Sequence, residues 1–170
     1  MIISLTGFMG AGKSTIAKRL STLLSSKQID LDAYIEDKRG MSIQEIFTSL
    51  GEEAFREIEE RCLNEILNYN DQKILIISLG GGTLISDINR QLIKDYTICI
   101  YLKASPNILA ERLAKSRKTR PLISETTDLK KSIERLFAER SAIYEECASI
   151  IIETDGLSAN EIIDKIVNSI

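Results

Sequence analysis

The stretch GFMGAGKST at residues 7 to 15 matches the pattern GxxxxGK[ST], which is typical of loops that hold phosphates. Its glycines let backbone N–H groups turn inward around phosphate oxygens. Lys13 adds a mobile positive charge, and Ser14 offers a hydroxyl to Mg²⁺, which prefers oxygen ligands. An apolar strand-like run precedes the loop and a helical pattern follows it. This context favours a phosphate-binding loop over a glycine turn that carries Lys-Ser by chance.

Two helical segments carry charged side chains on faces that are otherwise apolar. In residues 128 to 147, Arg140 falls in the middle of the apolar stripe. In residues 52 to 68, Glu59 lies within the stripe and Arg56 flanks it one turn away, so that an i,i+3 pair can fix the arginine. An arginine held in this way can still present its other donors to a carboxylate ligand. We therefore expect both arginines to bind an anion, with a purely structural ion pair as the alternative.

Two carboxylates lie at the end of the apolar run at residues 27 to 30, and three glycines follow the apolar run at residues 73 to 79. Strand alternation predicts that Asp30 and Asp32 share one face at the end of the second strand, next to the phosphate loop. One could hold Mg²⁺ through water and the other could orient a substrate hydroxyl, although a turn or helix cap would use the same residues. The third run, residues 73 to 79, has no terminal aspartate and continues into Gly80 to Gly82. We therefore assign the metal to Asp30, and we expect a small ligand to approach the glycine backbone closely.

The segment RKTRPL concentrates three positive charges, Arg117, Lys118 and Arg120, within four residues. A solvated basic loop is one interpretation. Above a triphosphate, however, a loop arginine can neutralise charge on the transferred phosphoryl group, an effect of up to about 4 to 7 kcal/mol in other phosphoryl transferases.

The elements that must position these residues alternate along the chain. Apolar strand-like runs lie at residues 2 to 6, 27 to 30, 73 to 79, 96 to 102 and 148 to 153, with helical patterns between them. This alternation predicts an α/β protein with a parallel sheet covered by helices on both faces. Two segments are longer than a simple alternation of strands and helices needs, namely residues 32 to 68 and 115 to 127. Such additional segments, here called excursions, usually form a pocket for a second substrate and its cover. The alternative is that they are passive insertions.

Length and composition bound the function. The 170 residues fit one domain, and a net charge of −3 gives no general attraction to nucleic acid or acidic membranes. With no histidine, imidazole-based catalysis is excluded. Three cysteines without metal-like spacing indicate free thiols in a reducing compartment. Without a basic leader or a bilayer-length apolar run, the sequence predicts a cytoplasmic protein, and the lack of a surplus apolar helix face predicts a monomer.

The ordered set of motifs strongly resembles the shikimate kinases over nearly the whole chain. The motifs are GFMGAGKST at 7 to 15, DLD at 30 to 32, FREIE at 55 to 59, GGG at 80 to 82, RPL at 120 to 122, and the RxxxY of Arg140 and Tyr144. The phosphate loop alone is shared with many NTPases, whereas the ordered set is far more specific.

The resemblance implies a P-loop NTPase-type three-layer sandwich with a five-stranded parallel sheet, forming a single kinase domain over residues 1 to 170. It implies a helical substrate-binding segment at 32 to 68 and a lid at 112 to 127. The implied activity is phosphorylation of the 3-hydroxyl of shikimate by ATP with Mg²⁺, which gives shikimate 3-phosphate and ADP.

The resemblance also implies roles for individual residues. The residues implied to contact ATP are Gly10, Ala11, Gly12, Lys13, Ser14, Thr15, Arg112 and Arg120. Those implied to bind shikimate are Asp32, Arg56, Gly80, Gly81, Gly82 and Arg140. Ser14 and Asp30 would serve Mg²⁺, and the catalytic set would be Lys13, Asp32 and Arg120.

Two other classes of function remain open from the residues themselves. A related small-metabolite kinase, such as a gluconate kinase or a nucleoside monophosphate kinase, could also use two arginines for an acidic acceptor. A nucleotide-dependent switch would bind the nucleotide without an acceptor. The set of Asp32, Arg56, Gly80 to Gly82 and Arg140 favours the shikimate acceptor.

Overall fold

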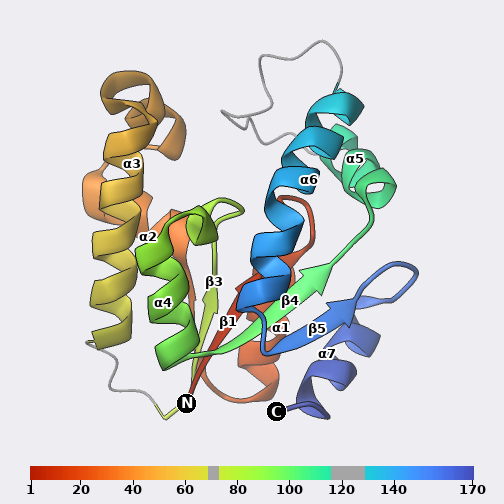
Figure 1. The fold of residues 1–170 in the computed structure, drawn as a ribbon. Coiled ribbons are helices and arrows are strands. Elements are labelled where there is room, and N and C mark those ends of the chain that lie inside the picture. The colour runs from red at the N-terminus through yellow and green to blue at the C-terminus, as the bar shows by residue number, and fades with distance from the viewer. Residues whose placement is uncertain (69–72, 116–128) are drawn as a thin grey trace.

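The computed structural model describes residues 1–68, 73–115 and 129–170, and these build one parallel sheet of five strands in the order β2-β3-β1-β4-β5 (Figure 1). The strands are β1 (Ile2–Thr6), β2 (Lys27–Asp30), β3 (Leu75–Ser78), β4 (Ile98–Lys103) and β5 (Ile150–Glu153). All four strand pairings are parallel. The predicted α/β class and the five strand positions are thereby confirmed.

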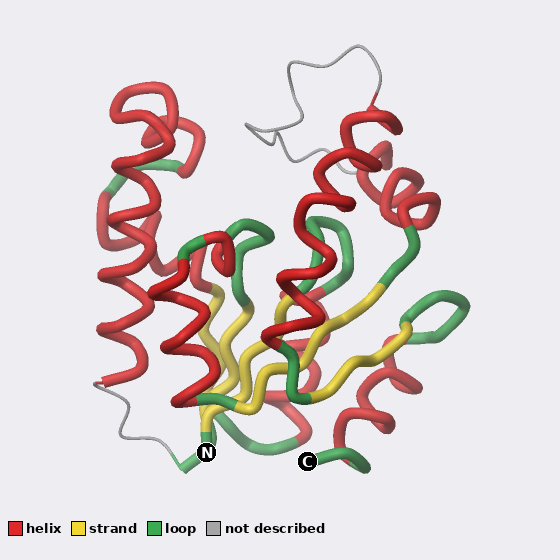
Figure 2. Tube along the Cα trace, viewed as in Figure 1, coloured by secondary structure: helices red, strands yellow, loops and turns green. Residues whose placement is uncertain are grey.

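Helices cover both faces of the sheet. They are α1 (Lys13–Leu23), α2 (Leu31–Arg39), α3 (Ile43–Asn68), α4 (Asp87–Tyr96), α5 (Pro106–Lys115), α6 (Leu129–Cys147) and α7 (Ala159–Val167), with a 3₁₀ turn η1 (Thr83–Ile85). Helices α1 and α7 pack together on one face, and α4 and α6 pack on the other (Figure 2). Within the described parts of the chain, no helix is both long and apolar enough to cross a membrane.

The register of the sheet brings three loops to one edge. Leu5 of β1 and Asp30 of β2 both pair with Ser78 of β3, so the three strands end at the same level. In a parallel sheet the carboxyl ends of all strands lie at one edge, and ligands bind there. The phosphate loop after β1, the carboxylates after β2 and the glycines after β3 therefore meet at this edge.

The predicted excursion at residues 32 to 68 consists of α2 and α3, which pack against each other beyond β2. Gly51 has non-helical dihedrals (φ 84°, ψ 170°) and separates a short first part of α3 from residues 52 to 68. The first part begins with a capping box, because Ser42 N–H donates to Glu45 Oε2 at 2.7 Å and Glu45 N–H donates to Ser42 Oγ at 3.2 Å. The longer part is therefore an independent helix that carries Arg56 and Glu59.

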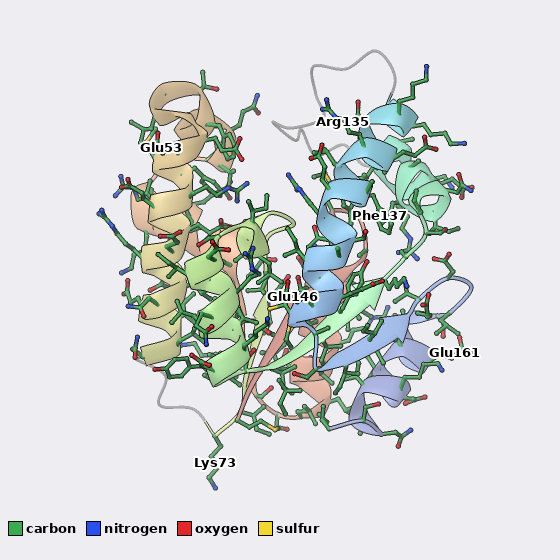
Figure 3. All side chains as sticks on the ribbon, in the orientation of Figure 1. Glu53, Lys73, Arg135, Phe137, Glu146 and Glu161 are labelled. Atoms are coloured by element: carbon green, nitrogen blue, oxygen red, sulfur yellow. The ribbon has the colours of Figure 1, made fainter. Side chains whose placement is uncertain are left out.

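Helix α6 packs against the phosphate loop through an aromatic contact. Phe137 projects from α6 (Figure 3), and its ring centroid lies 5.9 Å from that of Phe8 in the phosphate loop. Cys62, Cys99 and Cys147 are buried free thiols, which confirms the prediction made from their spacing. The packing ties α6 to the phosphate loop, so that α6 can present side chains close to a bound nucleotide.

Candidate active site

The phosphate loop has the backbone that its glycines predict. Gly7 has φ 140°, and a Cβ at this position would lie 2.7 Å from the carbonyl oxygen of Leu102, so glycine is required on both counts. The loop leads directly into α1, whose first residue is Lys13. Lys13 is buried, and its Nζ donates to the carbonyl oxygens of Gly7 and Phe8 at 2.8 and 3.1 Å. The amino group thus lies folded over the loop, at the N-terminal end of α1, where anions are favoured.

A cavity of about 300 Å³ adjoins the loop. Its lining joins most of the residues predicted to bind nucleotide and metal, namely Gly10, Gly12, Lys13, Ser14, Thr15, Asp30 and Arg112, with Asp32, Gly80 and Gly81 from the predicted acceptor site. Arg56, Gly82 and Arg140 do not line the cavity, but the contacts described below place them around the same glycine turn. The predicted nucleotide and acceptor residues therefore adjoin each other.

Ser14 and Asp30, the pair predicted to bind a metal, lie in direct contact. Ser14 Oγ donates to Asp30 Oδ2 at 2.6 Å and lies 3.3 Å from Ser78 Oγ. A hydroxyl and a carboxylate oxygen beside a phosphate loop fit Mg²⁺, which takes one or two protein ligands and completes its shell with phosphates and water. A Mg²⁺ ion bound in this way needs no further protein ligands. The described residues contain no group of three or more His, Cys, Asp or Glu that could hold a metal.

The predicted placement of Asp32 on a strand is wrong. β2 ends at Asp30, which caps α2 by accepting a hydrogen bond from Ala33 N–H at 3.3 Å, and Asp32 lies in the first turn of that helix. Alternation of faces applies only within a strand, and here the helix begins at Leu31. Both carboxylates nevertheless line the cavity, and Asp32 Oδ1 would lie 2.9 Å from a Cβ on Gly80.

Arg56 is held by the carboxylate that its spacing predicted. Its Nη1 donates to Glu59 Oε2 at 2.8 Å, and its Nη2 donates to Glu52 Oε1 at 3.1 Å. Glu59 is fully buried and also accepts a hydrogen bond from Thr83 Oγ1 at 2.7 Å. Burial alone would lower the pKa of Arg56, but the charges and hydrogen bonds of Glu59 and Glu52 together outweigh burial, and the pKa is raised. The guanidinium is therefore charged and fixed in direction.

Arg140 has a different environment. It is only 5% exposed, and its Nη1 donates to the carbonyl oxygen of Gly81 at 3.2 Å. Among residues 1–68, 73–115 and 129–170, no carboxylate lies within ion-pair distance of this guanidinium. A buried charge is stable only when it is paired or hydrogen-bonded, and the bond to Gly81 supplies one such partner. The other donors of the guanidinium fit the predicted role of Arg140 in binding an anion.

The three glycines fit closely among these groups. A Cβ on Gly82 would lie 2.5 Å from Nη2 of Arg56, and a Cβ on Gly81 would lie 3.3 Å from the backbone nitrogen of Met9 in the phosphate loop. The turn therefore separates the predicted acid site from the phosphate site by the width of one backbone.

Three polar residues of the site were not assigned a role from the sequence. Ser78 ends the apolar run of β3 and faces Ser14, Thr83 follows the glycines and binds Glu59, and Tyr144 Oη donates to the carbonyl oxygen of Gly81. For Ser78 and Thr83, a polar residue next to glycines at a strand end was the available signal. Tyr144 lies on the apolar stripe of α6, where an aromatic residue usually belongs to the hydrophobic core, so its sequence position gave no signal of a polar role.

Of the two arginines predicted to contact the nucleotide, only Arg112 lies within the described residues. Arg112 of α5 is exposed, and its Nη1 donates to the carbonyl oxygen of Gly10 at 3.3 Å, beside the cavity. Arg120 lies outside the described residues, as do residues 116 to 127 of the predicted lid.

A phosphate loop after the first strand of a parallel sheet, with side-chain oxygens beside it and two arginines around the adjoining glycine turn, is typical of a P-loop phosphotransferase. Comparison with known proteins narrows the class. The family model for shikimate kinase matches residues 9–170. A shikimate kinase of Enterococcus faecalis is 39% identical over 99% of this chain and 97% of its own length, and one of Histophilus somni is 40% identical over 98% and 95%. The chain belongs to the shikimate kinase family.

Solved structures agree with this assignment. A shikimate kinase from Acinetobacter baumannii in complex with shikimate has a TM-score of 0.91 and 33% identity, and covers 99% of this chain and 91% of its own. A deoxyadenosine kinase from M. mycoides has a TM-score of 0.63 at 19% identity over 99% of this chain and 97% of its own, and so shares the fold alone.

Proposed function

We propose that this protein transfers the γ-phosphoryl group of ATP to the 3-hydroxyl of shikimate, giving shikimate 3-phosphate and ADP. The observation that carries the proposal is Arg140, a buried guanidinium without a carboxylate partner among the described residues, beside a phosphate loop. The structure of a relative in complex with shikimate, at a TM-score of 0.91, supports the choice of acid.

The nucleotide would lie on the phosphate loop, with its β- and γ-phosphates against the backbone of Gly10 to Thr15 and the amino group of Lys13. Ser14 and Asp30 would hold Mg²⁺ through their side-chain oxygens, which lie 2.6 Å apart. When bound, Mg²⁺ would neutralise charge that develops on the phosphates. Arg112, which contacts the loop at Gly10, would close the nucleotide site from α5.

The acid would bind on the other side of the glycine turn. Its carboxylate would face Arg56 and Arg140, and the backbone of Gly80 to Gly82 would contact the ring, because the absence of side chains permits this approach. Asp32 would accept a hydrogen bond from the substrate hydroxyls and orient the 3-hydroxyl in line with the γ-phosphate. A loose transition state makes little demand on a base, so orientation is the main task of this carboxylate.

We assign the remaining parts of the chain in the same way. Residues 1 to 170 form a single kinase domain, in which 32 to 68 bind the acceptor and 112 to 127 act as the lid that excludes water. Arg120 would contribute charge to the transferred phosphoryl group. We propose that the protein acts as a cytoplasmic monomer and does not use nucleic acid, since its free thiols fit a reducing compartment and its net charge is −3.

The test is an ADP-release assay coupled to NADH oxidation, with shikimate, gluconate and nucleoside monophosphates offered separately as acceptors. We expect shikimate to stimulate ADP release strongly and the others to leave the background rate unchanged. Stimulation by gluconate or by a monophosphate instead would assign the chain another acceptor. ATP binding without stimulation by any acceptor would favour a nucleotide-dependent switch.

A further inference from the structure

The carbonyl oxygen of Gly81 accepts two hydrogen bonds from α6. Arg140 Nη1 donates at 3.2 Å and Tyr144 Oη donates at 2.5 Å. The two donors are four residues apart, so they project from the same face of the helix. Both side chains are buried, with 5% of Arg140 and 1% of Tyr144 exposed. One donor is enough to satisfy a buried carbonyl, and the two lone pairs of this oxygen let it accept a second.

The two donors differ in what else they can do. The guanidinium of Arg140 has five N–H groups in a fixed plane, and the bond from Nη1 to Gly81 limits the directions in which that plane can face a carboxylate. The hydroxyl of Tyr144 has one proton, which already points at Gly81. Burial raises the pKa of Tyr144 above its ordinary value, which itself lies well above neutrality, so the hydroxyl keeps this proton in any ordinary assay buffer. The tyrosine is thus a dedicated donor, and the arginine is a shared one.

The position of Gly81 matters on its other side as well. A Cβ on this residue would lie 3.3 Å from the backbone nitrogen of Met9 and 3.9 Å from the carbonyl oxygen of Gly7. The peptide therefore sits directly against the phosphate loop. The two bonds to its carbonyl therefore link the glycine turn to the helix that carries Arg140.

We propose that Tyr144 is a positioning residue whose hydroxyl holds the Gly81 carbonyl in place, so that Arg140 is free to bind the carboxylate of the acceptor. The proposal rests on the proposed function, because it takes an acid as the ligand of Arg140. Without the hydroxyl, the arginine would have to serve both the carbonyl and the acid. The cost would therefore appear in acid binding and not in nucleotide binding.

The test compares Tyr144→Phe with Tyr101→Phe. Tyr101 is a matched control because it is fully buried, its ring centroid lies 5.3 Å from that of Tyr144, and its hydroxyl has no hydrogen-bond partner among the described residues. We expect Tyr144→Phe to raise the KM for shikimate roughly tenfold, with kcat and the KM for ATP changed less than about twofold. Tyr101→Phe should leave all three unchanged. A wild-type KM for shikimate in Tyr144→Phe, or equal effects of both variants, would overturn the proposal.

A second comparison separates positioning from general support of the fold. In an Arg140→Ala background there is no arginine to free, so adding Tyr144→Phe should lower kcat/KM for shikimate no further, whereas the melting temperature should fall more than it does in the wild-type background. A tenfold loss in kcat/KM in both backgrounds would indicate a structural role and overturn the proposal. If the wild-type protein shows no shikimate-stimulated turnover, the proposed function fails, and the melting temperatures still report whether the two donors share the carbonyl.

Discussion

Replacing Gly82 with alanine tests whether Arg56 must occupy its present position. Gly82 has φ −115° and ψ 0°, which alanine adopts without strain. The added Cβ would lie 2.5 Å from Nη2 and 2.9 Å from Nη1 of Arg56, whereas ordinary contact begins at 3.4 Å. The guanidinium must therefore retreat by about 1 Å from the glycine turn. Because the obstructing atoms are the far end of a flexible side chain, the fold should persist.

The expected loss of shikimate affinity follows from the hydrogen bond between Arg56 and the carboxylate of shikimate, which this retreat would break. A hydrogen bond to a charged group contributes about 1.5 to 3 kcal/mol, which corresponds to roughly 10- to 150-fold in affinity. Steady-state kinetics should show the KM for shikimate raised by about this factor, the KM for ATP changed less than about twofold, and a melting temperature within a few degrees of wild type. Adding the change to Arg56→Ala should have no further effect. A wild-type KM for shikimate in a folded Gly82→Ala protein would refute the placement of Arg56 at the acid.

Three further predictions concern the loop, the second arginine and stability. Lys13→Ala should abolish turnover, since we propose that Lys13 holds the phosphates on the loop, and a wild-type kcat in an ADP-release assay would contradict this role. Arg140→Ala should weaken shikimate binding roughly 10- to 150-fold in calorimetry and leave ATP binding unchanged. Arg135 is an exposed arginine on the same helix, and Arg135→Ala should change the affinity for neither ligand. Equal losses of shikimate and ATP affinity in Arg140→Ala would refute the role of Arg140. Burial raises the pKa of Tyr101 to about 12, above the unfolded value near 10, so its stabilisation is complete below pH 10 and is lost as the pH rises toward 12. Urea denaturation should show the wild-type free energy of unfolding falling about 2 to 3 kcal/mol more than that of Tyr101→Phe over this range, and parallel curves would contradict the cause.

Periodicity in the sequence predicted which charged side chains are buried. A helix turns by a fixed angle per residue, so Glu59 and Arg140 were expected on apolar faces, and both are buried. The i,i+3 pair of Arg56 with Glu59 followed from the same geometry and is confirmed at 2.8 Å. Such features are local, and one segment of sequence is sufficient to predict them.

Contacts between distant segments could not be predicted in this way. Thr83 lies 24 positions from its partner Glu59, and Gly81 lies 59 positions from Arg140. The placement of Asp32 failed for a local reason, because an extended pattern was continued past the point where Asp30 caps a helix. Asp30 as a cap was the competing interpretation, and a carboxylate that directly precedes a helix is typical of that role.

We infer that Arg140 and Arg56 hold a small acid beside a bound triphosphate. The most direct measurement is a crystal structure of the protein with shikimate and a non-hydrolysable ATP analogue. We predict the carboxylate of shikimate within about 3 Å of the Nη atoms of both arginines, and its 3-hydroxyl between Asp32 and the γ-phosphate. Shikimate bound elsewhere, with Arg140 contacting only the Gly81 carbonyl and Arg56 contacting only glutamates, would contradict the account.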